Sequence, residues 1–159
     1  MDAGERTWGL VASRFHGELC DALEAGARSC LVAHGAADGS VLTFRVPGAF
    51  EIPPAARAVL DSGRVDAVIG LGVVIRGETP HFDYVCRAVT DGLARLAFES
   101  NRPVAFGVLT VASPEQARER AGGARGNKGW EAALAALEMA QLLDRLAEAP
   151  RVGFRLGAP

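Results

Sequence analysis

The feature that most constrains the fold is an almost uninterrupted run of apolar residues, 66–75, which passes through a short polar turn into a helix. The run is rich in valine and isoleucine, which is typical of a strand buried on both faces of a parallel sheet. After the turn, Thr79 suits the N-cap of a helix and Pro80 its first position. Apolar residues then recur at helical spacing and predict one buried helix face: Phe82, Val85, Val89, Leu93 and Leu96.

The same order of strand, turn and helix recurs along the chain. Strands are expected at 7–12, 41–46, 66–75 and 104–110. Helices are expected after each of them, with Pro53 and Pro54 at the start of the second and Ser113 as the N-cap of a short one over 114–121. Alternation of this kind predicts an α/β fold, a three-layer αβα sandwich with a four-stranded parallel sheet, flavodoxin-like in style.

The last part of the chain is expected to form a glycine-rich flexible joint over 122–129 and a final helix over 130–147. The predicted core stripe of that helix consists of Trp130, Leu134, Leu137, Ala140 and Leu143. We expect one domain over residues 1–159, with 150–159 as a C-terminal tail.

Composition excludes several classes of function. The net charge of −2 provides no positive surface for nucleic acid or an anionic membrane. No apolar run approaches the roughly 18 residues of a membrane span, and residues 1–6 do not resemble a signal peptide. Cys20 and Cys30 fall on one expected helix, about 15 Å apart along its axis, too far for a disulfide. We therefore expect these thiols and Cys86 to be reduced, in a cytoplasmic protein.

Candidate site residues gather where the predicted strands end. Parallel strands bring their carboxyl ends to one edge of the sheet, where ligands bind. Phe15 follows the first strand and Phe50 the second, and such aromatic rings either stack on a planar heterocycle or belong to the core. Glu51 can accept hydrogen bonds from ligand hydroxyls, or it merely complements a helix dipole.

His81 lies in the first turn of the helix that follows the central strand. The dipole there favours a neutral imidazole, which can accept and return a proton. The alternative is a hydrogen-bonded surface histidine. A metal site is not expected, because His16, His34 and His81 lack the spacing of metal ligands.

Three cations are candidates for binding a phosphate. Arg118 and Arg120 are two residues apart on an expected helix, so at most one of them points into a site. The alternative is a solvated helix face. Lys128 lies in Gly126-Asn-Lys-Gly129, which lacks the pattern of a Walker A loop and is otherwise a helix hinge.

Taken together, these segments resemble the lumazine synthase family of riboflavin biosynthesis. The most specific one is Gly72-Val-Val-Ile-Arg-Gly-Glu-Thr-Pro-His-Phe-Asp-Tyr84. The others run in family order and spacing: Ser13-Arg-Phe15, Val46-Pro-Gly-Ala-Phe-Glu-Ile-Pro53, Pro103-Val-Ala-Phe-Gly-Val-Leu-Thr110, Glu115-Gln-Ala117, Arg120-Ala-Gly122 and Gly126-Asn-Lys-Gly-Trp-Glu-Ala-Ala133. The resemblance implies a transferase that condenses 5-amino-6-(D-ribitylamino)uracil with 3,4-dihydroxy-2-butanone 4-phosphate, without a cofactor or metal.

By position, the resemblance assigns the site residues to three groups. The pyrimidine and its ribityl chain would contact residues after the first three strands: Phe15, His16, Ala49, Phe50, Glu51, Val73, Val74 and Ile75. His16 stands where many members have asparagine. The phosphate would lie on the backbone of Glu78 and Thr79, beside the proton carrier His81. Three further residues would complete the site: Phe106, Arg120 and Lys128. Of these, Arg120 would bind the phosphate and would act with His81 as a catalytic residue.

The resemblance also implies partners. Family members are homo-oligomers whose active sites lie between subunits, so a pentamer is expected here, and a shell of twelve pentamers is a further hypothesis. Riboflavin synthase is a candidate partner protein. Two alternatives remain: a catalytically silent homologue that forms a shell or binds a flavin, and a flavodoxin-like domain that binds phosphate or signals.

Overall fold

The structure is a computed structural model that describes residues 1–148, so the predicted tail at 150–159 lies outside the described residues. Its sheet strands are β1 (Trp8–Ser13), β2 (Val41–Val46), β3 (Ala67–Ile75) and β4 (Val104–Val111). Its helices are α1 (Gly17–Ala33), α2 (Ile52–Asp61), α3 (His81–Ser100), α4 (Pro114–Arg120) and α5 (Lys128–Glu148). Two 3-10 turns, Asp38–Ser40 and Ala49–Glu51, and two very short strands, β5 (Ala121–Gly123) and β6 (Gly126–Asn127), complete the described elements.

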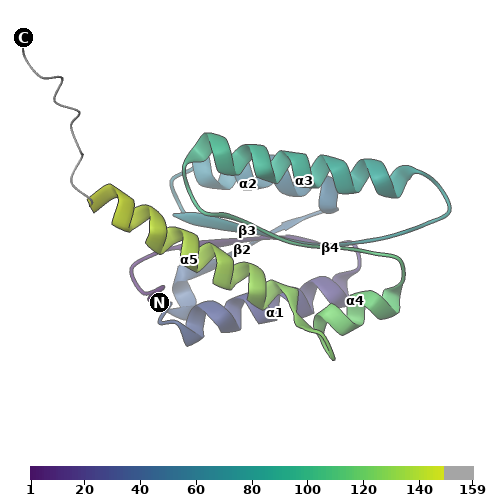
Figure 1. The fold of residues 1–159 in the computed structure, drawn as a ribbon, viewed down its shortest axis with the longest axis horizontal. Helices are drawn as coiled ribbons and strands as arrows, with labels where there is room; N and C mark the ends of the chain where they lie inside the picture. Colours follow the sequence, from purple (N-terminus) through teal and green to yellow (C-terminus); the bar gives the residue numbers. More distant parts are fainter. Residues whose placement is uncertain (149–159) are drawn as a thin grey trace, which may run out of the picture.

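The four main strands form one parallel sheet in the order β2-β1-β3-β4. Helices α2 and α3 cover one face of this sheet, and α1, α4 and α5 cover the other (Figure 1). The predicted α/β sandwich with a four-stranded parallel sheet is therefore confirmed. Because every strand runs the same way, all four carboxyl ends meet at one edge of the sheet.

The central strand β3 is buried on both faces, as its continuous apolar run predicts. Its side chains alternate between two cores. Ile69 and Leu71 pack with residues of α1 and α5, whereas Val68 packs with residues of α2 and α3. Burial on both sides explains why the run shows no polar alternation.

Thr79 does not cap α3, contrary to the prediction. The helix begins at His81, and Pro80 occupies the N-cap position without a side-chain hydrogen bond. The Pro80 carbonyl accepts the first helical hydrogen bonds, from the N–H groups of Asp83 at 2.9 Å and Tyr84 at 3.4 Å. Pro80 therefore lies one residue before the first helical position expected for it, and its φ of −62° is compatible with the helix that follows. At α4, by contrast, Ser113 accepts a hydrogen bond from the Gln116 N–H, as predicted for its N-cap.

The predicted core stripe of α5 is only partly right, because Leu137 and Ala140 are buried as expected and the other three members are not. Trp130 is 37% exposed, and Leu134 and Leu143 are only half-buried. The buried residues of α5 are mostly small: Gly129, Ala132, Ala133, Ala136, Leu137 and Ala140. Small residues allow α5 to lie close against α1, so larger apolar side chains are left at the margin.

The glycine-rich joint is an ordered hairpin rather than a loop without structure. Strands β5 and β6 pair in antiparallel fashion, with Ala121 opposite Asn127, and α5 begins immediately afterwards at Lys128. Gly122 and Gly126 have positive φ angles of 115° and 75°, which glycine adopts without strain. Among residues 1–148, no helix is both long and apolar enough to cross a membrane.

Candidate active site

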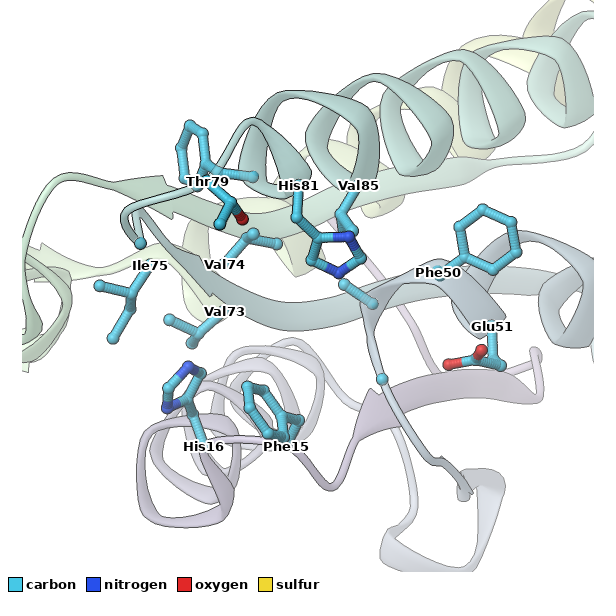
Figure 2. A pocket seen from close by; sticks show the side chains of 14 residues that line it. Phe15, His16, Phe50, Glu51, Val73, Val74, Ile75, Thr79, His81 and Val85 are labelled. Carbon is cyan, nitrogen blue, oxygen red and sulfur yellow. The ribbon is translucent and has the colours of Figure 1, made fainter.

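A cavity of about 610 Å³ opens at the carboxyl ends of β1, β2 and β3. Figure 2 shows its walls, with Phe15 and His16 on one side, Phe50 and Glu51 on another, and His81 entering from α3. The lining is mainly apolar, with a few convergent polar groups, which is the usual character of a small-molecule site. Ten of the residues predicted from the sequence line it: Phe15, His16, Ala49, Phe50, Glu51, Val73, Val74, Ile75, Thr79 and His81.

The loop after β1 holds an aromatic ring open to solvent. Phe15 is 66% exposed, and its N–H donates to Ser13 Oγ at 3.1 Å and to the Pro47 carbonyl at 3.2 Å. These bonds hold the backbone of the loop while the ring remains available for stacking. The alternative assignment of Phe15 to the core is wrong.

His16 joins this loop to α1 in an unusual backbone conformation. Its φ of 58° and ψ of 49° lie in the left-handed region, which histidine and asparagine adopt more readily than most residues with a side chain. Its carbonyl accepts hydrogen bonds from Leu19 and Cys20, and its ring lies edge-on to Phe15 with the ring centroids 4.5 Å apart. The conformation therefore restricts which residue types fit at this wall of the cavity.

The loop after β2 supplies the second aromatic ring and a carboxylate. Phe50 is 60% exposed, which excludes the alternative that it belongs to the core. Glu51 lies beside it at the end of the 3-10 turn Ala49–Glu51 and lines the cavity. A carboxylate next to an exposed ring can accept hydrogen bonds from the hydroxyls of a ligand that stacks there.

His81 is the first residue of α3, and its exposed side chain reaches into the cavity (Figure 2). This places an imidazole, which can accept and return protons, between the two aromatic walls. The adjoining turn supplies Gly77 and Thr79 to the lining, whereas Glu78 is exposed and does not line the cavity.

Two lining residues were assigned to the core by the sequence. Phe82 and Val85 are half-buried and line the cavity next to His81. Their apolar spacing predicts the buried face of α3, but it does not indicate that the first residues of that face line a cavity. The guanidinium of Arg76 lies 4.2 Å from the centroid of the Phe82 ring and donates to Asp83 Oδ1 at 2.9 Å.

Cys20 is hydrogen-bonded to the loop that carries Phe15 and is not suited to nucleophilic catalysis. Its thiol is buried and donates to the Phe15 carbonyl, with Sγ and O 3.2 Å apart. Burial raises the pKa of this thiol to about 11, so it stays protonated at neutral pH. Cys20 and Cys30 share α1, as predicted, and no three His, Cys, Asp or Glu side chains within 1–148 are grouped to hold a metal ion.

The three remaining predicted residues lie elsewhere. Phe106 is 44% exposed on the edge strand β4, Arg120 ends α4 and Lys128 begins α5. They line a separate shallow cavity of about 260 Å³ beside β4. Within one chain, the structure therefore brings these three together but does not bring them to His81.

The two arginines of α4 differ in their surroundings, as their spacing predicts. Arg118 pairs with Glu115 at 3.2 Å and lines a groove near His16. Arg120 donates from Nη1 to the Gln116 carbonyl at 3.0 Å and lies beside Phe106 and Lys128. Lys128 also forms an ion pair with Glu131.

Comparison with known proteins gives one consistent family. Residues 5–144 match the sequence model of a family described as 6,7-dimethyl-8-ribityllumazine synthase. A protein of that name from Aquifex aeolicus is 52% identical over 139 residues, which are 87% of this chain and 90% of the relative. A relative of the same name from Anaeromyxobacter dehalogenans is 53% identical over 89% of this chain and 87% of its own length. Another from Desulfosudis oleivorans is 48% identical over 91% of this chain and 92% of its own length. The matched region contains the residues that line the cavity and also Phe106, Arg120 and Lys128 beside β4.

Proposed function

The chain belongs to the 6,7-dimethyl-8-ribityllumazine synthase family, and from this we propose that it condenses 5-amino-6-(D-ribitylamino)uracil with 3,4-dihydroxy-2-butanone 4-phosphate. The products are 6,7-dimethyl-8-ribityllumazine, phosphate and water, and the reaction is the penultimate step of riboflavin biosynthesis. The observation that carries the proposal is the cavity at the strand ends, where two exposed aromatic rings, a carboxylate and a histidine meet.

In this proposal the pyrimidine substrate occupies the larger part of the cavity. Its ring stacks on Phe15, and its ribityl hydroxyls donate to Glu51. The end of β3 supplies backbone contacts to the uracil, and the remaining wall contacts come from His16, Ala49, Phe50, Val73, Val74 and Ile75. Support comes from the exposure of both phenylalanine rings and from the presence of all these residues in one lining.

The phosphate substrate is placed at the start of α3. The N-cap Pro80 has no side-chain hydrogen bond to the first turn, so the free N–H groups there are not capped by a side chain. Such groups and the helix dipole favour an anion. Glu78 and Thr79 contribute their backbone to this site, and Arg120 adds a guanidinium that can bind two phosphate oxygens at once.

Because Arg120 lies away from the cavity in its own chain, the proposal requires a second copy of the chain. Phe106, Arg120 and Lys128 lie along the exposed side of β4, an edge strand. A neighbouring copy that sets this side against the cavity would complete the site. We propose a closed homo-oligomer with a pentamer as its unit, and a sixty-subunit shell as a further hypothesis. We also propose that the protein acts in the cytoplasm and that riboflavin synthase is a partner protein.

The mechanism follows from proton movement and positioning. The amine of the uracil condenses with the ketone to give an imine and a first water, phosphate is then eliminated, and closure of the ring by the second amine nitrogen releases a second water. His81 carries protons between these steps, which typically contributes about 10²–10⁴-fold. Holding two substrates side by side supplies much of the remaining acceleration. No enzyme nucleophile is needed, which agrees with the protonated state of Cys20.

The direct test mixes the purified protein with both substrates and follows the lumazine chromophore. We expect it to form faster than in a protein-free control and not at all when the butanone phosphate is left out. A silent homologue that binds a flavin or only forms a shell would leave the rate at that of the protein-free mixture, and this result would overturn the proposal.

Arg120→Ala is expected to raise the KM for the butanone phosphate while leaving the KM for the uracil nearly unchanged. Loss of a charge-assisted, two-pronged contact with the phosphate costs roughly 1.5–3 kcal/mol. Steady-state kinetics with each substrate varied in turn measures the effect. Arg118→Ala is the matched control, since Arg118 is exposed and paired with Glu115 on the same helix. Equal behaviour of the two variants would show that the faces of α4 are wrongly assigned.

A further inference from the structure

The start of α5 is fastened to the middle of α1 by one side chain, that of Asn127. Its Nδ2 donates to the Ala22 carbonyl at 2.8 Å. Its Oδ1 accepts from the N–H groups of Gly129 at 2.8 Å and Trp130 at 3.2 Å. One amide group therefore caps the first turn of α5 and also joins that turn to a helix about a hundred residues earlier in the chain.

Two glycines, Gly26 and Gly129, show that the two helices approach closely at this contact. Gly26 lies in the interior of α1, where glycine costs roughly 1 kcal/mol relative to alanine. A Cβ at Gly26 would lie 2.2 Å from Asn127 Oδ1, and a Cβ at Gly129 would lie 1.9 Å from the Leu23 carbonyl oxygen. Side chains at either position would force the two helices apart or turn the amide of Asn127 away from its partners.

The backbone of Asn127 is also close to that of both cations beside β4, Arg120 and Lys128. Across the hairpin it pairs with Ala121, the residue that follows Arg120. Along the chain it immediately precedes Lys128. The backbone that carries both cations is thus hydrogen-bonded to α1 through the amide of Asn127, in addition to the packing of α5 on α1.

We propose that Asn127 is a positioning residue for phosphate binding, because it sets where Arg120 and Lys128 stand relative to each other and to α1. This inference rests on the proposed function, in which those two cations face the phosphate of the second substrate. Asn127 itself lies beside α1 and touches no group assigned to substrate. Its effect should therefore appear in phosphate binding and not in binding of the uracil.

Two charge-neutral variants test this. In Asn127→Ser the hydroxyl can still cap α5, because serine is as good an N-cap as asparagine, but it is too short to reach the Ala22 carbonyl. In Gly26→Ala a methyl group on α1 displaces the amide while the helix gains a residue of higher helix propensity. In the oligomer as purified, both should raise the KM for the butanone phosphate and the Ki for inorganic phosphate roughly tenfold, with the KM for the uracil unchanged.

Gly39→Ala is the matched control, because no atom lies within 4 Å of a Cβ placed there. It should match the wild type in both KM values. If Asn127→Ser and Gly26→Ala change only thermal stability, or raise both KM values equally, Asn127 is a structural residue and the proposal is wrong. If Asn127→Ser does not assemble, Gly26→Ala alone decides between these results.

The inference and the proposed reaction can fail separately. A wild-type protein that makes no lumazine would overturn the reaction. Binding of inorganic phosphate, measured by calorimetry on the wild type and both variants, still tests the positioning role. Wild-type binding that weakens in both variants supports it. Equal binding by all three proteins, or no binding by the wild type, overturns it.

Discussion

His81→Ala is expected to slow turnover by about 10–10³-fold while the fold stays intact. The loss removes the proton carrier, and the remaining rate reflects two substrates still held side by side. The side chain of His81 is exposed at the first residue of α3, so its removal leaves no buried cavity. The measurement is kcat at saturating concentrations of both substrates, together with circular dichroism of the variant.

The matched control for this prediction is a histidine outside the cavity. His34 follows α1, and its Nδ1 lies 2.8 Å from the Cys30 carbonyl oxygen, far along α1 from His16. His34→Ala is therefore expected to keep the wild-type kcat. Wild-type turnover in a folded His81→Ala protein would remove His81 from the mechanism.

Much of the fold could be predicted because the strands carry strong local signals. The strand expected at 41–46 is found as Val41–Val46, and the run at 66–75 as Ala67–Ile75. The errors concern features that depend on tertiary distance. The spacing between α1 and α5 is set by Gly26 and Gly129, so alanines rather than Trp130 fill the contact. The periodicity of apolar residues identifies the buried face of a helix, but it contains no information on how closely a neighbouring helix approaches.

The candidate site divides in a similar way. Residues that follow β1, β2 and β3 could be expected to meet, because parallel strands end at a common edge. No such rule applies to Phe106, Arg120 and Lys128, which lie on an edge strand and at two helix ends. In the proposed site, their distance from the cavity depends on how copies of the chain pack. The residue pattern of a single chain gives no information on distances between subunits.

Co-expression of His81→Ala with Arg120→Ala subunits is therefore expected to give more activity per subunit than the mean of the two variants alone, when the butanone phosphate is kept well below the KM of the Arg120→Ala variant. If each site takes His81 from one subunit and Arg120 from the next, a mixed ring contains sites formed by two intact halves. When the two variants mix at random in equal amounts, about a quarter of the sites contain both an intact His81 and an intact Arg120. Different affinity tags on the two variants allow mixed oligomers to be purified, and lumazine formation per subunit measures the recovery.

The control is a mixture of the two variants that are expressed and purified separately and combined without exchange of subunits. Its activity should equal the mean of the two parents, because no mixed sites form. Sedimentation of each sample checks the assembly on which the argument depends. A stable monomer that turns over both substrates, or mixed oligomers no more active than that mean, would place His81 and Arg120 in separate functions and refute the shared site. A species near the mass of one pentamer, unchanged with protein and phosphate concentration, would exclude the shell but keep the shared site, because neighbours within one ring suffice to join the two halves.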